Sequence, residues 1–242
     1  MRRRSFFKAV TLGPLLLKAQ TLFAQSFDLI IRGGRVIDPS LNLDTIADVG
    51  IANGRIESID RELNASATDE INATNKIVLP GLLDIHAHYA QDDRGAHSCL
   101  SDGVTGWVDA GSAGADNIEE MVAVARSAPQ PARILLNIGR GGVIPEGDTA
   151  DISMANVEVA KAAIANNLDY VVGVKARLTS GVTANDIVVI RRAQEVASYF
   201  NLPLMIHMGQ SESSMASLVA ELKPGDVVTH MYAPPPNAII NN

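Results

Sequence analysis

Residues 77–88 read IVLPGLLDIHAH, an apolar run that ends in two histidines separated by a single residue. A short run rich in Ile, Val and Leu is typical of a strand buried in a parallel sheet. In extended backbone, residues i and i+2 point to the same side, so the imidazoles of His86 and His88 can reach one ion. The stretch therefore predicts a buried strand with a metal-binding pair at its C-terminal end.

Strand-like and helical segments alternate from this stretch onward. The six expected strands are Ile77–Asp84, Val104–Ala110, Arg133–Gly139, Tyr170–Lys175, Leu204–Met208 and Val227–His230. Amphipathic helices are expected between them, one over about 153–164 and one that Thr183 caps and Asn201 stops. This alternation predicts an α/β fold with about six βα units around a parallel sheet.

Four of the five histidines and one lysine stand at predicted strand ends: His86, His88, Lys175, His207 and His230. Parallel α/β barrels place their active sites at the carboxyl ends of their strands. A single histidine there would be read as an ordinary core residue. Four of them, with a lysine that follows four apolar residues, predict a metal site.

Three further residues have other expected roles. His97 lies in a predicted helix and is expected to be structural. Cys99, the single cysteine, is expected to be a buried thiol rather than a nucleophile. Asp109, at the end of the second strand, has two interpretations that stay open: a partner of a metal-bound imidazole, or a cap of the following turn.

The first 76 residues have a different pattern. Residues 1–25 join a basic start, MRRRSFFK, to a short apolar run, which is typical of an export signal, and the Arg3-Arg4 pair resembles a twin-arginine signal. The apolar run is too short to span a bilayer. Residues 26–76 contain short strands and an Asn53-Gly54 hairpin turn, which predict a small β-domain. The expected division is 1–25, 26–76 and 77–242. The expected location is the bacterial periplasm, or another destination of exported proteins.

Composition excludes several classes of protein. Of 242 residues, 47% are hydrophobic and 19% are charged, which excludes a disordered chain. After residue 25 the chain carries 15 basic and 27 acidic residues, so its body should repel nucleic acid and anionic membranes. One cysteine excludes a disulfide framework and a multi-cysteine zinc site.

The order His-x-His, Lys, His, His on successive strands resembles that of the amidohydrolase superfamily of metal-dependent hydrolases, and residues 77–88 resemble its most recognisable segment. Within it, the chain is similar to the dihydroorotase-like branch. Residues 108–114 and 173–177 resemble its amidohydrolase/deacetylase group, whose members cleave small N-acyl or O-acyl substrates. The resemblance implies a TIM-like (β/α)8 barrel, here incomplete, behind a small N-terminal β-sandwich.

The resemblance also implies two divalent metal ions. His86 and His88 would bind one, His207 and His230 the other, and Lys175 would bridge both as a carbamate derived from carbon dioxide. This role is chemically coherent, because burial lowers the pKa of a lysine and leaves a neutral amine that can react. Zinc is the expected metal, although manganese and cobalt suit the same ligands. A hydroxide shared by the ions would attack the amide or ester carbonyl.

The expected substrate is a small carboxylic acid that carries an acyl group. Arg177 could bind its carboxylate through a bidentate fork, or be a surface arginine on a loop; both interpretations stay open. Dihydroorotases carry an arginine two residues beyond the His-x-His pair, where this chain has Ala90. Hydrolysis of a cyclic amide, of the dihydroorotase or hydantoinase kind, is therefore the alternative activity.

One expected group has no counterpart. The family places an aspartate, a metal ligand and proton shuttle, at the end of the eighth strand, but the sequence ends at Asn242 after six predicted strands. The catalytic residue is therefore unknown, and we expect a truncated chain that is inactive alone. A non-catalytic metal-binding fragment is the rival hypothesis. The oligomeric state is open, a homo-oligomer included.

Overall fold

The computed structural model describes residues 26–88 and 94–232. The predicted export signal and Ala90 lie outside the described residues. The chain divides into two compact units, one up to Pro80 and one from Gly81. None of the helices in the described part of the chain has the length and apolar character needed to span a bilayer.

The N-terminal unit is one five-stranded sheet. Its strands are β1 (Phe27–Asp38), β2 (Leu43–Ala52), β3 (Arg55–Asp60), β4 (Ala67–Asn72) and β5 (Ile77–Val78), and a short 3-10 helix, η1 (Pro39–Leu41), follows β1. The order is β3-β2-β1-β4, and β5 also pairs with β1. A bulge at Gly33-Gly34 bends β1, so β4 pairs with its first half and β5 with its second. The resemblance implied a small β-sandwich, which has two sheets. The N-terminal unit is instead formed by one bent sheet.

Two local predictions in this unit have different outcomes. The hairpin is confirmed: Asn53 and Gly54 connect β2 to β3 with φ values of 52° and 71°, as a tight hairpin turn requires. The single strand predicted over Ile77–Asp84 is wrong. It is interrupted around Pro80, which has no N–H to donate and restricts the residue before it. As a result β5 belongs to the first sheet, and a new strand begins at Leu82.

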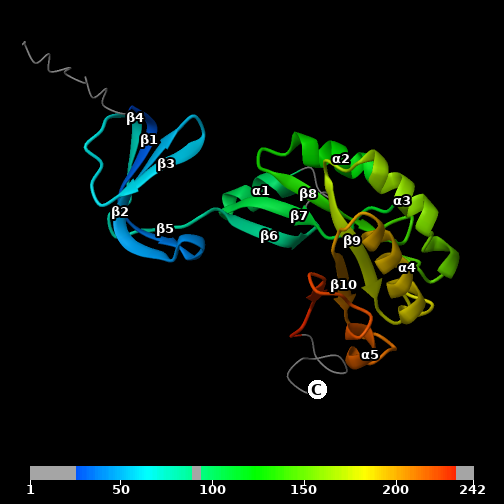
Figure 1. The fold of residues 1–242 in the computed structure, drawn as a ribbon. Helices are drawn as coiled ribbons and strands as arrows, with labels where there is room; N and C mark the ends of the chain where they lie inside the picture. The colour runs from blue at the N-terminus through cyan, green and yellow to red at the C-terminus, as the bar shows by residue number, and fades with distance from the viewer. Residues whose placement is uncertain (1–25, 89–93, 233–242) are drawn as a thin grey trace, which may run out of the picture. The chain divides into compact units, whose positions relative to one another are not determined.

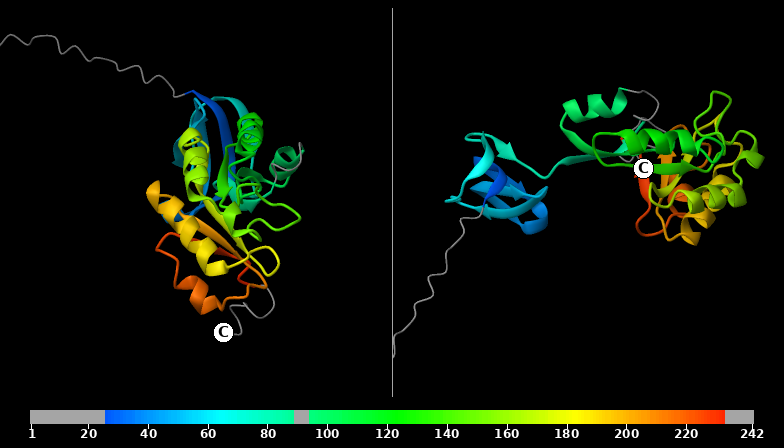
Figure 2. Two further views of the ribbon diagram at one scale, coloured as in Figure 1. Left: turned by 90° about the vertical axis from the view of Figure 1, so that its right-hand side faces the viewer. Right: turned by 90° about the horizontal axis from the view of Figure 1, so that it is seen from above.

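The C-terminal unit is a curled sheet of six parallel strands with helices on its outer face (Figures 1 and 2). The strands are β6 (Leu82–Ala87), β7 (Val104–Asp109), β8 (Ala132–Asn137), β9 (Val171–Leu178), β10 (Leu204–Met208) and β11 (Val227–Thr229). The helices are α1 (Gly95–Ser101), α2 (Ile118–Ser127), η3 (Ile152–Met154), α3 (Val157–Asn166), α4 (Asp186–Tyr199) and α5 (Met215–Val219). The strands lie side by side in chain order, as successive βα units require. The α/β prediction with six units is confirmed.

Side chains of the strands alternate between the helices and the concave face. Ile134 and Leu136 of β8 are fully buried in the cluster that includes the helices, whereas Leu135 belongs to a smaller cluster with Met205 and Ala110. Residues of β9 follow the same period of two, so Val174 and Ala176 join the large core. Lys175, between them, therefore projects on the face opposite the helices.

Two helix starts differ from the prediction. α4 begins after Asn185, whose side chain accepts the Val188 N–H at 3.0 Å. Thr183, the predicted cap, is buried and donates its hydroxyl to the Arg177 carbonyl instead. The helix predicted over 153–164 is η3 followed by α3, which Asn156 caps. Asn is preferred to Thr as an N-cap, which explains the first shift. Asn201, with φ 55°, follows the end of α4 as predicted.

Candidate metal centre

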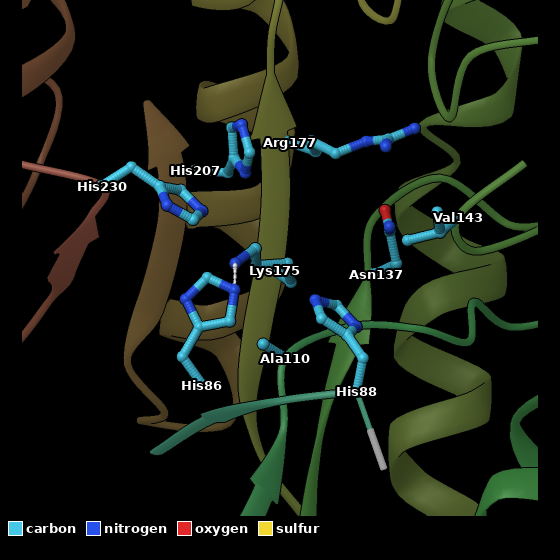
Figure 3. A pocket seen from close by; sticks show the side chains of 9 residues that line it. All are labelled: His86, His88, Ala110, Asn137, Val143, Lys175, Arg177, His207 and His230. Atoms are coloured by element: carbon cyan, nitrogen blue, oxygen red, sulfur yellow. Dashed lines mark hydrogen bonds between the residues drawn. The ribbon is translucent and has the colours of Figure 1, made fainter. Parts of the chain in front are cut away.

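A pocket of about 610 Å³ opens at the carboxyl ends of the parallel strands (Figure 3). Its lining residues are His86, His88, Ala110, Asn137, Val143, Lys175, Arg177, His207 and His230. All five predicted metal ligands and the predicted substrate-binding arginine are among them. The structure thus brings together side chains that are up to 144 positions apart, between His86 and His230, in the sequence. Their role as ligands stays a prediction.

Strand geometry explains how each side chain reaches the pocket. His86 lies in β6 and His88 directly follows it, so the two share one side of the extended chain. His207 lies in β10 two residues after Met205, on the same concave face. His230 directly follows β11 and has a φ of 63°, a left-handed value that few residues other than glycine adopt.

The imidazole rings form a close group. The ring centroids of His207 and His230 are 4.3 Å apart, those of His86 and His230 are 5.0 Å apart, and those of His86 and His88 are 5.5 Å apart. The Lys175 Nζ lies 3.4 Å from His86 Nε2 (dashed in Figure 3). Five nitrogen-bearing side chains therefore face one another across the pocket.

The pocket keeps its imidazoles neutral. Burial, reinforced by Lys175 and the neighbouring histidines, lowers the pKa of His86 to about 4. Burial, reinforced by the charge of His230, lowers the pKa of His207 to about 3. The pKa values of His88 and His230 are also lowered, chiefly by burial. Near neutral pH each ring therefore has a lone pair free for a metal ion.

Lys175 has the environment of an amine that can lose its proton. The residue is 2% exposed, and burial lowers the pKa of its amine to about 8. Its Nζ contacts the Met205 sulfur at 3.5 Å and His86 Nε2, neither of which carries a negative charge. The neutral form is therefore populated close to neutral pH, as the carbamate prediction requires.

These donors fit divalent ions of the zinc type, because neutral imidazole is among the preferred ligands of zinc. Within the described ranges, no three His, Cys, Asp or Glu side chains are placed as a ligand set for one ion. The predicted arrangement does not require such a trio. It gives each ion two imidazoles and shares Lys175 between both.

The sequence left two interpretations open for Asp109, and the structure contains elements of each. Its carboxylate accepts the Ser112 backbone N–H at 2.7 Å, which caps the turn after β7. The same carboxylate accepts the Ser112 hydroxyl at 2.7 Å, and that hydroxyl lies 2.7 Å from His88 Nδ1. Asp109 therefore reaches the imidazole through Ser112, a residue that the sequence analysis missed.

Arg177 lies in β9 and forms part of the pocket wall, so it is not a surface arginine on a loop. Its guanidinium makes a bidentate ion pair with Asp148, at 3.1 Å from Nε to Oδ2 and 2.5 Å from Nη2 to Oδ1. Asp148 is 1% exposed and also accepts the Asn137 side-chain N–H at 2.9 Å. The sequence analysis missed both residues. Asp148 lies in a long segment without strand or helix periodicity, whereas Asn137 is the last residue of β8.

The two remaining predictions concern α1. His97 lies in this helix, is exposed, and is not among the residues that line the pocket. Cys99 is a buried thiol, as predicted.

The chain matches no protein-family model. It is 28% identical to a deacetylase of Enterococcus faecalis over 89% of its own length and 59% of that protein's. It is also 28% identical to a dihydroorotase of Solibacter usitatus, over 74% of its length and 41% of that protein's. The chain thus spans about half the length of the curated relatives it matches.

Solved structures show the same fold. A crystal structure of an adenine deaminase superposes with a TM-score of 0.76 and 27% identity, over 88% of this chain and 59% of that one. A crystal structure of a dihydroorotase has a TM-score of 0.77 at 23% identity, over 88% and 60%. The strand-end residue pattern, the curled parallel sheet and these relatives support a dihydroorotase-like member of the amidohydrolase superfamily.

Proposed function

We propose that this chain provides the metal-binding part of a hydrolase that cleaves an amide or ester bond of a small N-acyl or O-acyl carboxylic acid. The observation that carries the proposal is the convergence of four neutral imidazoles and one buried lysine on a single pocket. The deacetylases among its relatives support acyl-group removal as the reaction class.

In this proposal His86 and His88 hold one divalent ion, His207 and His230 hold a second, and Lys175 is shared between them. Zinc is the proposed metal. Two such ions would polarise the substrate carbonyl and make water nucleophilic near neutral pH. The role of the protein is to lower the pKa values of the imidazoles and to direct the rings into one pocket.

Lys175 contributes through a covalent modification. The lone pair of its neutral amine would bond to the carbon of carbon dioxide, and one N–H proton would leave to solvent. The product is a carbamate with one negative charge and two oxygens, one for each ion. The pKa of about 8 makes the reactive amine available close to neutral pH. In protein supplied with ¹³C-labelled bicarbonate and zinc, a carbamate carbon signal that Lys175→Ala abolishes would support this step.

Arg177 is proposed to bind the substrate carboxylate. Asp148 engages its Nε and Nη2, which fixes the plane of the guanidinium and leaves Nη1 for a ligand. Because Asp148 is buried and also held by Asn137, this geometry is rigid before substrate arrives. A fixed guanidinium at the pocket wall favours small acids over neutral acyl compounds.

The second candidate is hydrolysis of a cyclic amide, which the similarity to dihydroorotases favours. N-acetyl amino acids, acetoxy acids and dihydroorotate, assayed side by side with zinc and with a chelator, separate the two. For the whole hydrolase of which this chain provides the metal-binding part, we expect metal-dependent release of acetate and no turnover of dihydroorotate. Turnover of dihydroorotate alone would favour the second candidate. No turnover of any substrate by a chain that binds zinc would favour the non-catalytic fragment.

A further inference from the structure

Ser112 connects a buried carboxylate to one of the four pocket imidazoles. Asp109 is fully buried and Ser112 is 7% exposed, so little water competes for the hydrogen bonds between them. The Ser112 hydroxyl is within 2.7 Å of both Asp109 Oδ2 and His88 Nδ1. The turn that brings Ser112 back over Asp109 passes through Gly111, whose φ of 82° suits glycine.

The number of protons on each group decides which atom donates in each of these hydrogen bonds. An Asp109 carboxylate only accepts, and it accepts both the backbone N–H and the hydroxyl of Ser112. A hydroxyl has one proton, so a Ser112 that donates to Asp109 must accept from His88. His88 then carries its proton on Nδ1 and has its lone pair on Nε2. Figure 3 shows this ring directed into the pocket.

We propose that Asp109 and Ser112 are positioning residues that fix His88 as the Nδ1–H tautomer and thereby make Nε2 its metal-binding atom. The inference rests on the proposed metal site, and it explains why one particular nitrogen of His88 carries the proton. Partners of this kind around a metal-bound histidine change metal affinity by about 10- to 100-fold.

Asp109→Asn tests the proton order with almost no change in shape. The Ser112 backbone N–H still requires an oxygen at the Oδ1 position, so the new amide NH₂ must stand at the Oδ2 position. It then donates to the Ser112 hydroxyl, which must turn its own proton toward His88. Both hydrogen bonds, from residue 109 to Ser112 and from Ser112 to His88, are then expected to reverse direction. His88 would be protonated on Nε2 and unable to bind metal through that atom.

The experiment compares metal-free and zinc-titrated full-length chain. Histidine ¹⁵N spectra identify the tautomer, with His88→Gln to assign the signal, and calorimetry with zinc alone measures affinity. We expect Nδ1–H in the wild type, Nε2–H in Asp109→Asn, and a 10- to 100-fold loss of zinc affinity in that variant. Ser112→Ala, which removes the link, should lose affinity in the same range.

Asp38→Asn is the matched control. Asp38 Oδ1 accepts both the backbone N–H and the hydroxyl of Ser40 in the N-terminal unit. This substitution should leave the His88 signal and zinc affinity unchanged. A wild-type His88 protonated on Nε2, or an Asp109→Asn variant that keeps Nδ1–H, would overturn the inference. If the tautomers behave as expected but the wild type binds no zinc, the result supports Asp109 and Ser112 as positioning residues and contradicts the proposed metal site.

Discussion

The backbone of Gly111 passes so close to Lys175 that a Cβ on Gly111 would stand 2.5 Å from the Lys175 Cβ and 2.6 Å from its Cγ. The loop after β7 therefore lies directly against the aliphatic part of the Lys175 side chain, which the proposed metal site requires. This contact leaves room only for glycine, whose φ there is 82°. We expect the position of the Lys175 amine to depend on this close approach.

Gly111→Ala should accordingly destabilise the chain and displace the lysine. The left-handed backbone costs alanine about 1–2 kcal/mol, and overpacking against Lys175 adds about 1–3 kcal/mol. Gly103→Ala is the matched control, because Gly103 has a φ of 85° and open space around its Cβ position. Urea unfolding should show a clearly larger loss for Gly111→Ala. Equal losses would show that Lys175 is not held in this way.

Acid should destabilise the metal-free chain through the pocket histidines. The folded pKa values are about 4 for His86 and about 3 for His207, below the value near 6.5 of an unfolded chain. Between these values the unfolded state binds more protons, so stability is full above about pH 6.5 and is lost as pH falls toward 3–4. Each histidine changes the free energy of unfolding by at most about 1.4 kcal/mol per pH unit, and solvent screening reduces this contribution.

Unfolding free energies measured between about pH 7 and pH 4.5 check this dependence. His207→Gln should flatten the slope, because it removes the largest shift. A wild-type curve that is flat across this range would contradict the lowered pKa values of His86 and His207.

Arg177→Met should raise KM for carboxylate substrates by about 10- to 100-fold. This factor corresponds to the loss of one hydrogen bond to a charged group, which contributes about 1.5–3 kcal/mol. It should change KM for the matching neutral amide much less. Arg177→Lys should restore little, because lysine cannot keep the bidentate contact with Asp148 while it binds a ligand. Steady-state kinetics on the acid and amide pair provide the measurement. Equal changes in KM for both substrates would contradict carboxylate recognition by Arg177.

The positions of the five pocket residues were predictable because their signal is local, although β9 continues to Leu178 and does not end at Lys175 as predicted. His86, His88, Lys175, His207 and His230 each terminate or follow an apolar run, and a period of two decides which face each occupies. Parallel strands then bring those ends to one edge of the sheet. No contact between distant loops is needed to place these five side chains.

Ser112 and Asp148 could not be predicted in the same way. Their positions depend on loops that touch only in the fold, where glycines such as Gly139 and Gly142 allow backbones to approach closely. A β-carbon on Gly142 would stand 2.3 Å from the Ser112 carbonyl oxygen. Such contacts have no periodic pattern in the sequence.

Export through the twin-arginine route stays a prediction and has a direct test. Fusion of residues 1–25 to a reporter that is active only after export should give periplasmic activity in a bacterial host. Arg3→Lys together with Arg4→Lys should abolish it, because that route recognises the arginine pair. Activity that survives the double substitution would exclude the twin-arginine route, and no activity in the wild-type fusion would exclude export by this segment.

The metal content of Lys175→Ala beside the wild type tests the central claim most directly. Chain purified with zinc and analysed by elemental spectrometry should hold about two ions in the wild type, as binuclear hydrolase sites do, and almost none in Lys175→Ala. Lys161→Ala, which removes a lysine paired with Glu158 and Glu195 on the helical face, should keep the wild-type content. An unchanged zinc content in Lys175→Ala would contradict a lysine shared between two ions.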